Sequence, residues 1–153
     1  MKKIFLFLAF NLFFQFLFSQ VSTLEVKVYL EGPYFSGQMT PLLNVLGQLP
    51  LEQPYDTLPW NYYGSESVLN IPNSNIVDWV LVDILELLEN DSIYTFEVIA
   101  RKAGFLLNNG NITGTDGINN LVFNNLDISG HYIRINHRNH LAIISSNPLL
   151  EEN

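Results

Sequence analysis

Hydrophobic and polar residues alternate along much of the chain with a period of two, which is typical of β-strands with one buried face. The longest such run is 131–145, which carries all three histidines. Its apolar parity holds Ile133, Ile135, Leu141 and Ile143, and its other parity holds Tyr132, Arg134, Asn136, Arg138 and His140. The pattern predicts a single strand with one buried and one solvated face.

Two polar residues, His137 and Asn139, fall on the apolar parity of this run. Either they are buried polar groups with hydrogen-bonding partners, or a β-bulge between them and Leu141 resets the register. Both alternatives keep the run as a strand.

Other alternating or β-branched runs predict further strands. We expect strands at 24–31, at 93–107, around Ile112 and at 121–123, and turns at 89–92, 108–110 and 115–117. The turn at Asn108-Asn109-Gly110 has the clearest signal, because Asn and Gly tolerate positive φ.

The apolar segment 75–88 fits two kinds of element. Its apolar spacing suits a helix capped by Ser74 or Asn75. Its β-branched residues and Trp79 favour a buried strand, which is our prediction.

Residues 34–74 break every periodic run with five prolines and three glycines. One or two helical turns are expected within 39–46. The rest is predicted to be a long irregular segment that packs on the domain through its aromatic residues. The short strands and turn signals elsewhere predict an all-β fold, an antiparallel two-sheet sandwich.

The first 19 residues have the form of a secretory signal peptide. Lys2 and Lys3 precede an apolar stretch, and Ser19 is a small residue before an expected cleavage at Gln20. The stretch is shorter than a membrane-spanning helix requires. We therefore expect one exported domain, 20–153, with no membrane span after cleavage, located in the periplasm, on the cell surface or outside the cell.

Charge and cysteine content narrow the function. Without the leader, five Lys and Arg face 15 acidic residues, a formal charge of −10. This acidity argues against nucleic acid and anionic lipid as partners. The chain has no cysteine, so an exported domain must be held by its core without disulfides.

Residues 116–134, D-G-I-N-N-L-V-F-N-N-L-D-I-S-G-H-Y-I-R, resemble the turn and strand signature of prealbumin-like, immunoglobulin-like bacterial surface modules. The resemblance implies that Gly130 makes a tight turn and that Tyr132 opens a core strand. It implies an immunoglobulin-like sandwich as the form of the fold.

A second set of motifs spans most of 24–150. The motifs are V-K-V-Y-L-E-G-P-Y, P-L-E-Q-P-Y, P-W-N-Y, G-S-E-S-V, I-V-D-W-V-L-V, A-R-K-A-G-F-L-L-N-N-G and H-R-N-H-L. Together they resemble an uncharacterised exported domain of gliding-type bacteria, which in relatives often lies next to dockerin-like repeats. The resemblance implies no catalytic residues.

The segment His137-Arg138-Asn139-His140 is the first candidate site. Imidazoles are common ligands of zinc and copper, and either the His137–Asn139 pair on one face, or His140 with an Asp from elsewhere, could bind a metal or a polar ligand. On a flat strand, however, His137 and His140 point to opposite faces and cannot share a metal unless a bulge re-aims one of them. We favour a structural role, in which His137 and Asn139 are hydrogen-bonded inside the sandwich and anchor the long segment or Asp78.

Aromatic residues form the second candidate. Trp60, Tyr62 and Tyr63 would make a glycan-binding patch if they were exposed together; otherwise they fill the core, which is the interpretation that we favour.

Carboxylates and oxygen ligands supply weaker candidates. A pair among Glu66, Asp78, Asp83 and Glu97 could serve glycoside hydrolysis, but the spacing does not indicate which two would face each other. Oxygen ligands at Asn109, Asn111 and Asp116 suggest calcium, yet the EF-hand pattern is missing, so no cofactor and no metal is expected.

These observations predict an exported, non-enzymatic binding or structural module at or outside the cell surface. Its partner would be a glycan or another surface protein. The alternative is a small secreted carbohydrate-active enzyme that uses carboxylates near 137–140.

Overall fold

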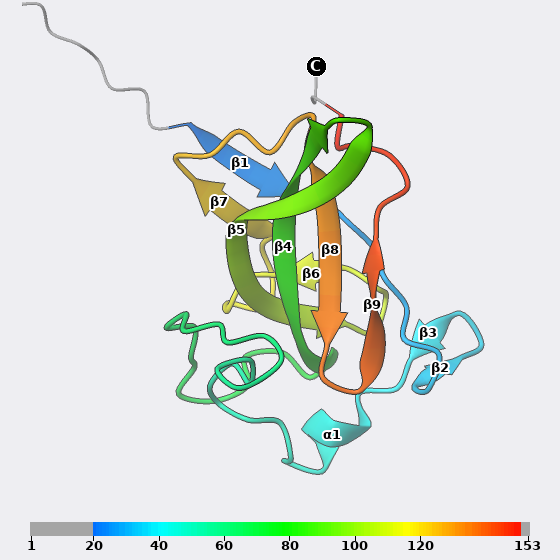
Figure 1. Ribbon diagram of the computed structural model, residues 1–153. Helices are drawn as coiled ribbons and strands as arrows, with labels where there is room; N and C mark the ends of the chain where they lie inside the picture. Colours follow the sequence, from blue (N-terminus) through cyan, green and yellow to red (C-terminus); the bar gives the residue numbers. More distant parts are fainter. Residues whose placement is uncertain (1–19, 151–153) are drawn as a thin grey trace, which may run out of the picture.

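In a computed structural model that describes residues 20–150, the chain is mainly antiparallel β-structure, as the sequence predicts (Figure 1). The expected leader, 1–19, and the last three residues, 151–153, lie outside the described residues. Within 20–150, none of the helical structure has the length and apolarity that a membrane-crossing segment needs.

A five-stranded antiparallel sheet forms the centre of the fold, in the order β6-β5-β4-β8-β9. Its strands are β4 (Ile76–Asn90), β5 (Ile93–Leu107), β6 (Ile112–Thr113), β8 (Tyr132–His137) and β9 (His140–Ile144). The tight turn predicted at 108–110 joins β5 to β6, and Gly110 has a φ of 89° there.

β4 confirms the prediction of a strand at 75–88. Every residue from Ile76 to Leu85 is buried. Both faces of a central strand are covered, so its residues need not alternate between apolar and polar. This explains why the segment has no clear period of two.

Two register shifts bend the long β4–β5 pair. Ile76 pairs with Leu107 and Asp78 with Leu106, so Val77 is an additional residue on β4. Ile84 pairs with Ala100 and Leu85 with Val98, so one further residue is inserted in β5. Such bulges increase the local twist, and β5 curves strongly around β4 (Figure 1).

One face of the sheet is covered by β1 (Val21–Leu24), β7 (Leu121–Asn124) and the extended segment that follows β1. Leu24, Val28 and Leu30 are buried in this layer, on the predicted parity. The prediction of a strand over 24–31 is otherwise wrong, because after Leu24 the segment makes only the isolated bridge between Lys27 and Asn111.

The long segment 34–74 covers the other face of the central sheet. It contains β2 (Tyr34–Phe35), β3 (Gln38–Met39) and the single helical turn α1 (Leu42–Val45), which confirms the helical turn expected within 39–46. Its Tyr55 is fully buried against Trp79, and the Tyr55 hydroxyl donates a hydrogen bond of 2.8 Å to the Trp79 carbonyl. The Trp79 indole N–H donates in turn to the Pro50 carbonyl at 2.8 Å, so sheet and segment are joined in both directions.

The run 131–145, predicted to be one strand, is instead the hairpin β8–β9, with Arg138 and Asn139 in the turn. Ile143 pairs with Ile135 in this hairpin, but β9 is the last strand of the sheet, and its apolar residues are not covered as those of β8 are. Leu141 is 94 % exposed and Ile143 is 51 % exposed. β9 is therefore an edge strand, while β8 lies between β4 and β9. Gly130, with a φ of 73°, makes the turn before Tyr132 opens β8.

Candidate functional site

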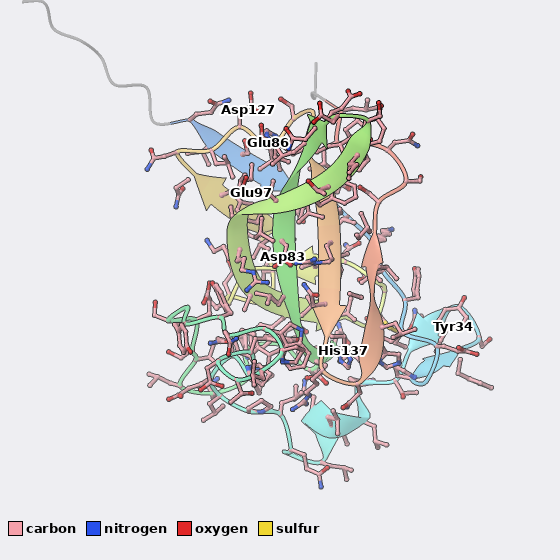
Figure 2. All side chains as sticks on the ribbon, viewed as in Figure 1. Tyr34, Asp83, Glu86, Glu97, Asp127 and His137 are labelled. Atoms are coloured by element: carbon pink, nitrogen blue, oxygen red, sulfur yellow. The ribbon has the colours of Figure 1, made fainter. Side chains whose placement is uncertain are left out.

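The most unusual feature of the sheet is a pair of buried carboxylates on β4, Asp78 and Asp83. Figure 2 shows Asp83 at the middle of the sheet and His137 near its lower end. The chain has three arginines, Arg101, Arg134 and Arg138, and all three bind one of these two carboxylates. A buried charge is stable only when it is paired and hydrogen-bonded, so these contacts are required by the burial.

Asp83 is completely buried, and it lies directly opposite Arg101 on β5 and Arg134 on β8 in the strand register. Arg101 Nε donates to Asp83 Oδ1 at 3.0 Å, and Arg134 Nε and Nη2 donate to Oδ2 at 2.8 and 2.5 Å. The Asn136 amide adds a bond of 3.0 Å to Oδ2. One carboxylate thus holds two guanidinium groups across three adjacent strands.

A surface hollow of about 310 Å³ opens over these arginines, and we name it the arginine hollow. Its lining consists of Pro59, Trp60, Arg101, Arg134, Asn136, His137, His140, Leu141 and Ala142. The Trp60 carbonyl accepts a bond of 2.6 Å from Arg101 Nη1, which fixes the long segment at the edge of the hollow. None of these lining residues is acidic.

Asp78 has its own set of partners at the turn of the β8–β9 hairpin. Arg138 Nη2 donates to Asp78 Oδ1 at 2.9 Å, and His137 Nε2 lies 3.1 Å from Oδ2. The Trp79 backbone N–H donates to Oδ1 at 2.8 Å. The expected contact between His137 and Asp78 is therefore present, and it ties the hairpin turn to β4.

The two histidines of the turn form a directional chain of hydrogen bonds. His137 Nδ1 accepts from the Asn139 backbone N–H at 3.2 Å, so the proton of His137 is on Nε2 and faces Asp78. His140 Nδ1 lies 2.9 Å from His137 Nδ1 and must be the donor of that bond. Burial, and then the nearby His137, lower the pKa of His140.

Two predictions about this segment are wrong. His137 and His140 do not point to opposite faces, because the hairpin makes them cross-strand partners with ring centroids 4.8 Å apart. Asn139 is exposed in the turn and does not join the buried cluster. Residues 20–150 contain no group of three or more His, Cys, Asp or Glu side chains placed to hold a metal ion.

The candidate patch of Trp60, Tyr62 and Tyr63 is not formed, and the favoured interpretation, that these rings fill the core, is wrong for Tyr63. Tyr63 is 81 % exposed, whereas Trp60 and Tyr62 are half-buried. Tyr62 donates its hydroxyl proton to Glu66 at 2.7 Å, and Trp60 packs edge-on against Tyr55. Of the three, Trp60 alone lines the arginine hollow.

The four acidic candidates are dispersed. Asp83 and Asp78 are held by arginines, Glu66 accepts a hydrogen bond from Tyr62, and Glu97 is exposed on β5. Glu66 and Asp78 line two different surface hollows.

Two of the three residues considered for calcium, Asn109 and Asp116, accept hydrogen bonds within their turns. Asn109 Oδ1 accepts from the Asn111 N–H at 3.0 Å. The Asp116 carboxylate accepts from Ile118 and Asn119, and the bond from the Ile118 N–H contributes most to lowering the pKa of Asp116. These hydrogen bonds give Asn109 and Asp116 a structural role in their turns.

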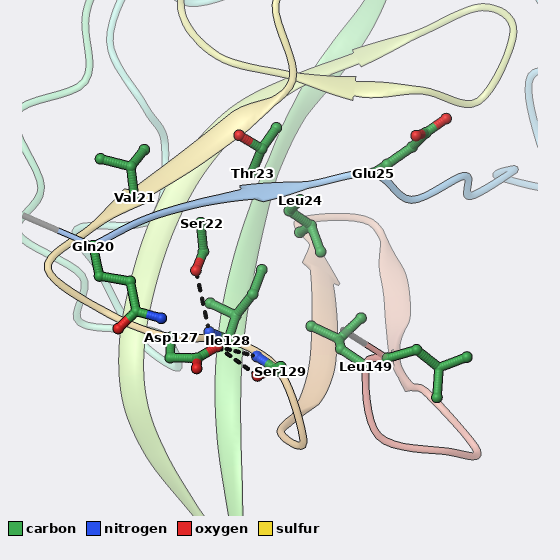
Figure 3. A pocket seen from close by; sticks show the side chains of 11 residues that line it. Gln20, Val21, Ser22, Thr23, Leu24, Glu25, Asp127, Ile128, Ser129 and Leu149 are labelled. Atoms are coloured by element: carbon green, nitrogen blue, oxygen red, sulfur yellow. Dashed lines mark hydrogen bonds between the residues drawn. The ribbon is translucent and has the colours of Figure 1, made fainter. Parts of the chain in front are cut away.

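A second hollow, of about 380 Å³, lies beside β1 (Figure 3). Ser129 donates both its hydroxyl and its backbone N–H to Asp127, which lowers the pKa of that carboxyl group. The Ser22 hydroxyl donates to the Leu126 carbonyl and accepts from the Ile128 N–H. Ser22, Asp127 and Ser129 are thus engaged in local hydrogen bonds, and neither arginine nor aromatic side chains line this hollow.

Comparisons with protein-family models, with curated proteins and with solved structures found no match to this chain. The arginine hollow is therefore interpreted from its own chemistry. Sequence reasoning found its Trp60, His137 and His140 but missed Arg101 and Arg134. The available signal was Asp83, because an acid inside the apolar run 76–85 is expected to be buried and must then have a basic partner.

The hydrogen-bond chain leads to a prediction about stability. His137→Ala removes a buried donor to Asp78 and should lower the free energy of unfolding by roughly 1–3 kcal/mol. His140→Ala removes a half-exposed ring and should have a smaller effect. Thermal unfolding of both variants tests this, and equal melting temperatures would contradict it.

Proposed function

We propose that this chain is an exported, non-enzymatic binding module that acts at or outside the cell surface and takes a glycan in the arginine hollow. The proposal of export rests on the leader-like residues 1–19 and on the resemblance to exported domains of gliding-type bacteria. As the finer form of the fold, we propose a prealbumin-like, immunoglobulin-like sandwich. The β1–β7 pair that packs on one face of the central sheet supports this assignment.

The observation that carries the proposed function is the combination of Trp60 with Arg101 and Arg134 at one open hollow. Sugar rings have apolar faces that pack on aromatic rings, and their hydroxyl groups accept hydrogen bonds from planar donors such as guanidinium. The volume, about 310 Å³, lies at the lower end of the range for small-ligand sites.

The carbohydrate-active enzyme remains the alternative, and the geometry favours it less. Glycoside hydrolysis uses two carboxyl groups that flank the scissile bond across a cleft. Asp83 lies beneath the arginines of the hollow, and its two oxygens accept hydrogen bonds from Arg101, Arg134 and Asn136. This carboxylate positions the guanidinium groups of Arg101 and Arg134, which suits ligand binding better than catalysis.

A glycan array tests the proposal, with the protein applied with and without calcium. Trp60→Ala should abolish or strongly reduce binding, because it removes the aromatic ring from the hollow. Tyr63→Ala is the matched control: it removes an exposed ring of the same segment that does not line the hollow, and binding should persist. Failure to bind any glycan would refute the proposed function.

A further inference from the structure

We infer that the ligand of the arginine hollow is an acidic sugar, which places its carboxylate on Arg101 and Arg134 and its ring on Trp60. This inference rests on the proposed function and specifies the chemical class of the ligand. It is carried by the charge balance of the hollow, by the orientation of the two guanidinium groups and by the position of Trp60.

The charge balance is the first step. Two guanidinium groups share the single carboxylate of Asp83, which leaves one positive charge in excess. The lining of the hollow contains no acidic residue, although the whole chain has 15 acids against seven Lys and Arg. A hollow lined by one sign of charge attracts ligands of the opposite sign.

The orientation of the guanidinium groups is the second step. The buried carboxylate of Asp83 accepts hydrogen bonds from the Nε atoms of both arginines, and so fixes both guanidinium groups. Among residues 20–150, Arg101 Nη2 and Arg134 Nη1 have no protein hydrogen-bond partner, and the two side chains are 27 % and 28 % exposed. These donors are therefore available to a planar carboxylate. Donors fixed before binding lose little conformational entropy when the ligand arrives.

Trp60 distinguishes a sugar from other carboxylates. Its carbonyl binds Arg101 Nη1 at 2.6 Å, so the residue is fixed to the same guanidinium that would meet the ligand. Its side chain packs edge-on against the buried Tyr55, which holds the ring beside the hollow. A carboxylate attached to a pyranose ring satisfies the arginines and the indole together, whereas the C-terminal carboxylate of a peptide satisfies the arginines alone.

The test compares three probes by calorimetric titration at physiological salt and without divalent cations. They are a galacturonic acid oligosaccharide, the same oligosaccharide as its methyl ester, and a short peptide with a free C-terminal carboxylate. Esterification keeps the ring and removes the charge, so it should weaken binding by at least about tenfold. The peptide should bind as weakly as the ester.

The variants use two neighbouring basic residues on opposite faces of β5. Arg101→Gln removes a charge from the hollow and should weaken binding of the acidic oligosaccharide by at least about tenfold. Lys102→Gln removes the same charge from the other face, where Lys102 Nζ donates to the Val122 carbonyl, and should leave the affinity within about twofold. Arg101→Lys keeps a positive charge to pair with Asp83, so it controls for a loss of binding that is caused by misfolding. It should also weaken binding, because it loses the planar fork.

The outcomes separate the two levels of the proposal. Equal affinity for acid and ester would overturn the acidic-ligand inference and leave glycan binding intact. Peptide binding as tight as that of the acidic sugar would overturn the assignment to a sugar. Equal losses in Arg101→Gln and Lys102→Gln would overturn the site. No binding of any glycan, here or on the array, would refute the proposed function itself.

Discussion

Asp83→Asn should lower the free energy of unfolding by about 3 kcal/mol, the lower end of the range for removing one partner of a buried ion pair. The variant keeps the shape of the side chain but removes the charge that holds Arg101 and Arg134. The cost stays at the lower end because both arginines are partly exposed, and water can solvate them in part. Urea unfolding with a two-state fit measures the change.

A matched control for this variant is Glu97→Gln on the exposed part of β5. It removes the same charge. Because Glu97 lies directly opposite Glu86, the substitution removes a repulsion between like charges, and no stability should be lost. A loss of less than about 1 kcal/mol for Asp83→Asn would contradict the assignment of Asp83 as the centre of the cluster. Replacing Asp83, Arg101 and Arg134 together by apolar residues should recover stability relative to Asp83→Asn.

Trp79→Ala should cost about 3–5 kcal/mol, as expected for a large buried aromatic residue. Trp79 is completely buried and packs against Phe105 with ring centroids 4.1 Å apart. Its indole N–H also holds Pro50, so the variant loses core volume and the attachment of the long segment at once. The midpoint of urea unfolding should fall accordingly.

Trp79→Phe separates the two contributions. It keeps an aromatic ring against Phe105 and loses the hydrogen bond to Pro50, so it should be clearly less destabilising than Trp79→Ala. Tyr63→Ala, which truncates an exposed ring, should leave the midpoint nearly unchanged. If Trp79→Ala and Tyr63→Ala had equal midpoints, the central role of Trp79 in the core would be refuted.

The sequence was most informative where local chemistry determines the structure. The β-branched residues of 76–85 indicated a strand, and the Asn109-Gly110 turn was predicted from its need for positive φ. The prediction of one strand over 131–145 failed at the hairpin turn, because Arg138-Asn139 carries no glycine or proline and the alternation continues past the turn. Exposure of Leu141 on an edge strand is a tertiary property that the alternation of residues does not reveal.

The site was only partly predictable for a related reason. The contact between Asp78 and His137 was expected, since both are polar residues in apolar runs. The cluster around Asp83 depends on strand order and register, which place Arg101 and Arg134 directly opposite it on two neighbouring strands. Neither order nor register can be read from the positions of these residues along the chain.

The arginines that clasp Asp83 also face the arginine hollow, and this double use has a practical consequence. A molecule that occupies the hollow binds the folded chain and not the unfolded one, so it must raise the melting temperature, by an amount that grows with the logarithm of its concentration relative to its dissociation constant. Label-free thermal-shift screening of sugar libraries would then identify ligands by the rise in melting temperature. The ligand would contact the same guanidinium groups that hold three strands together.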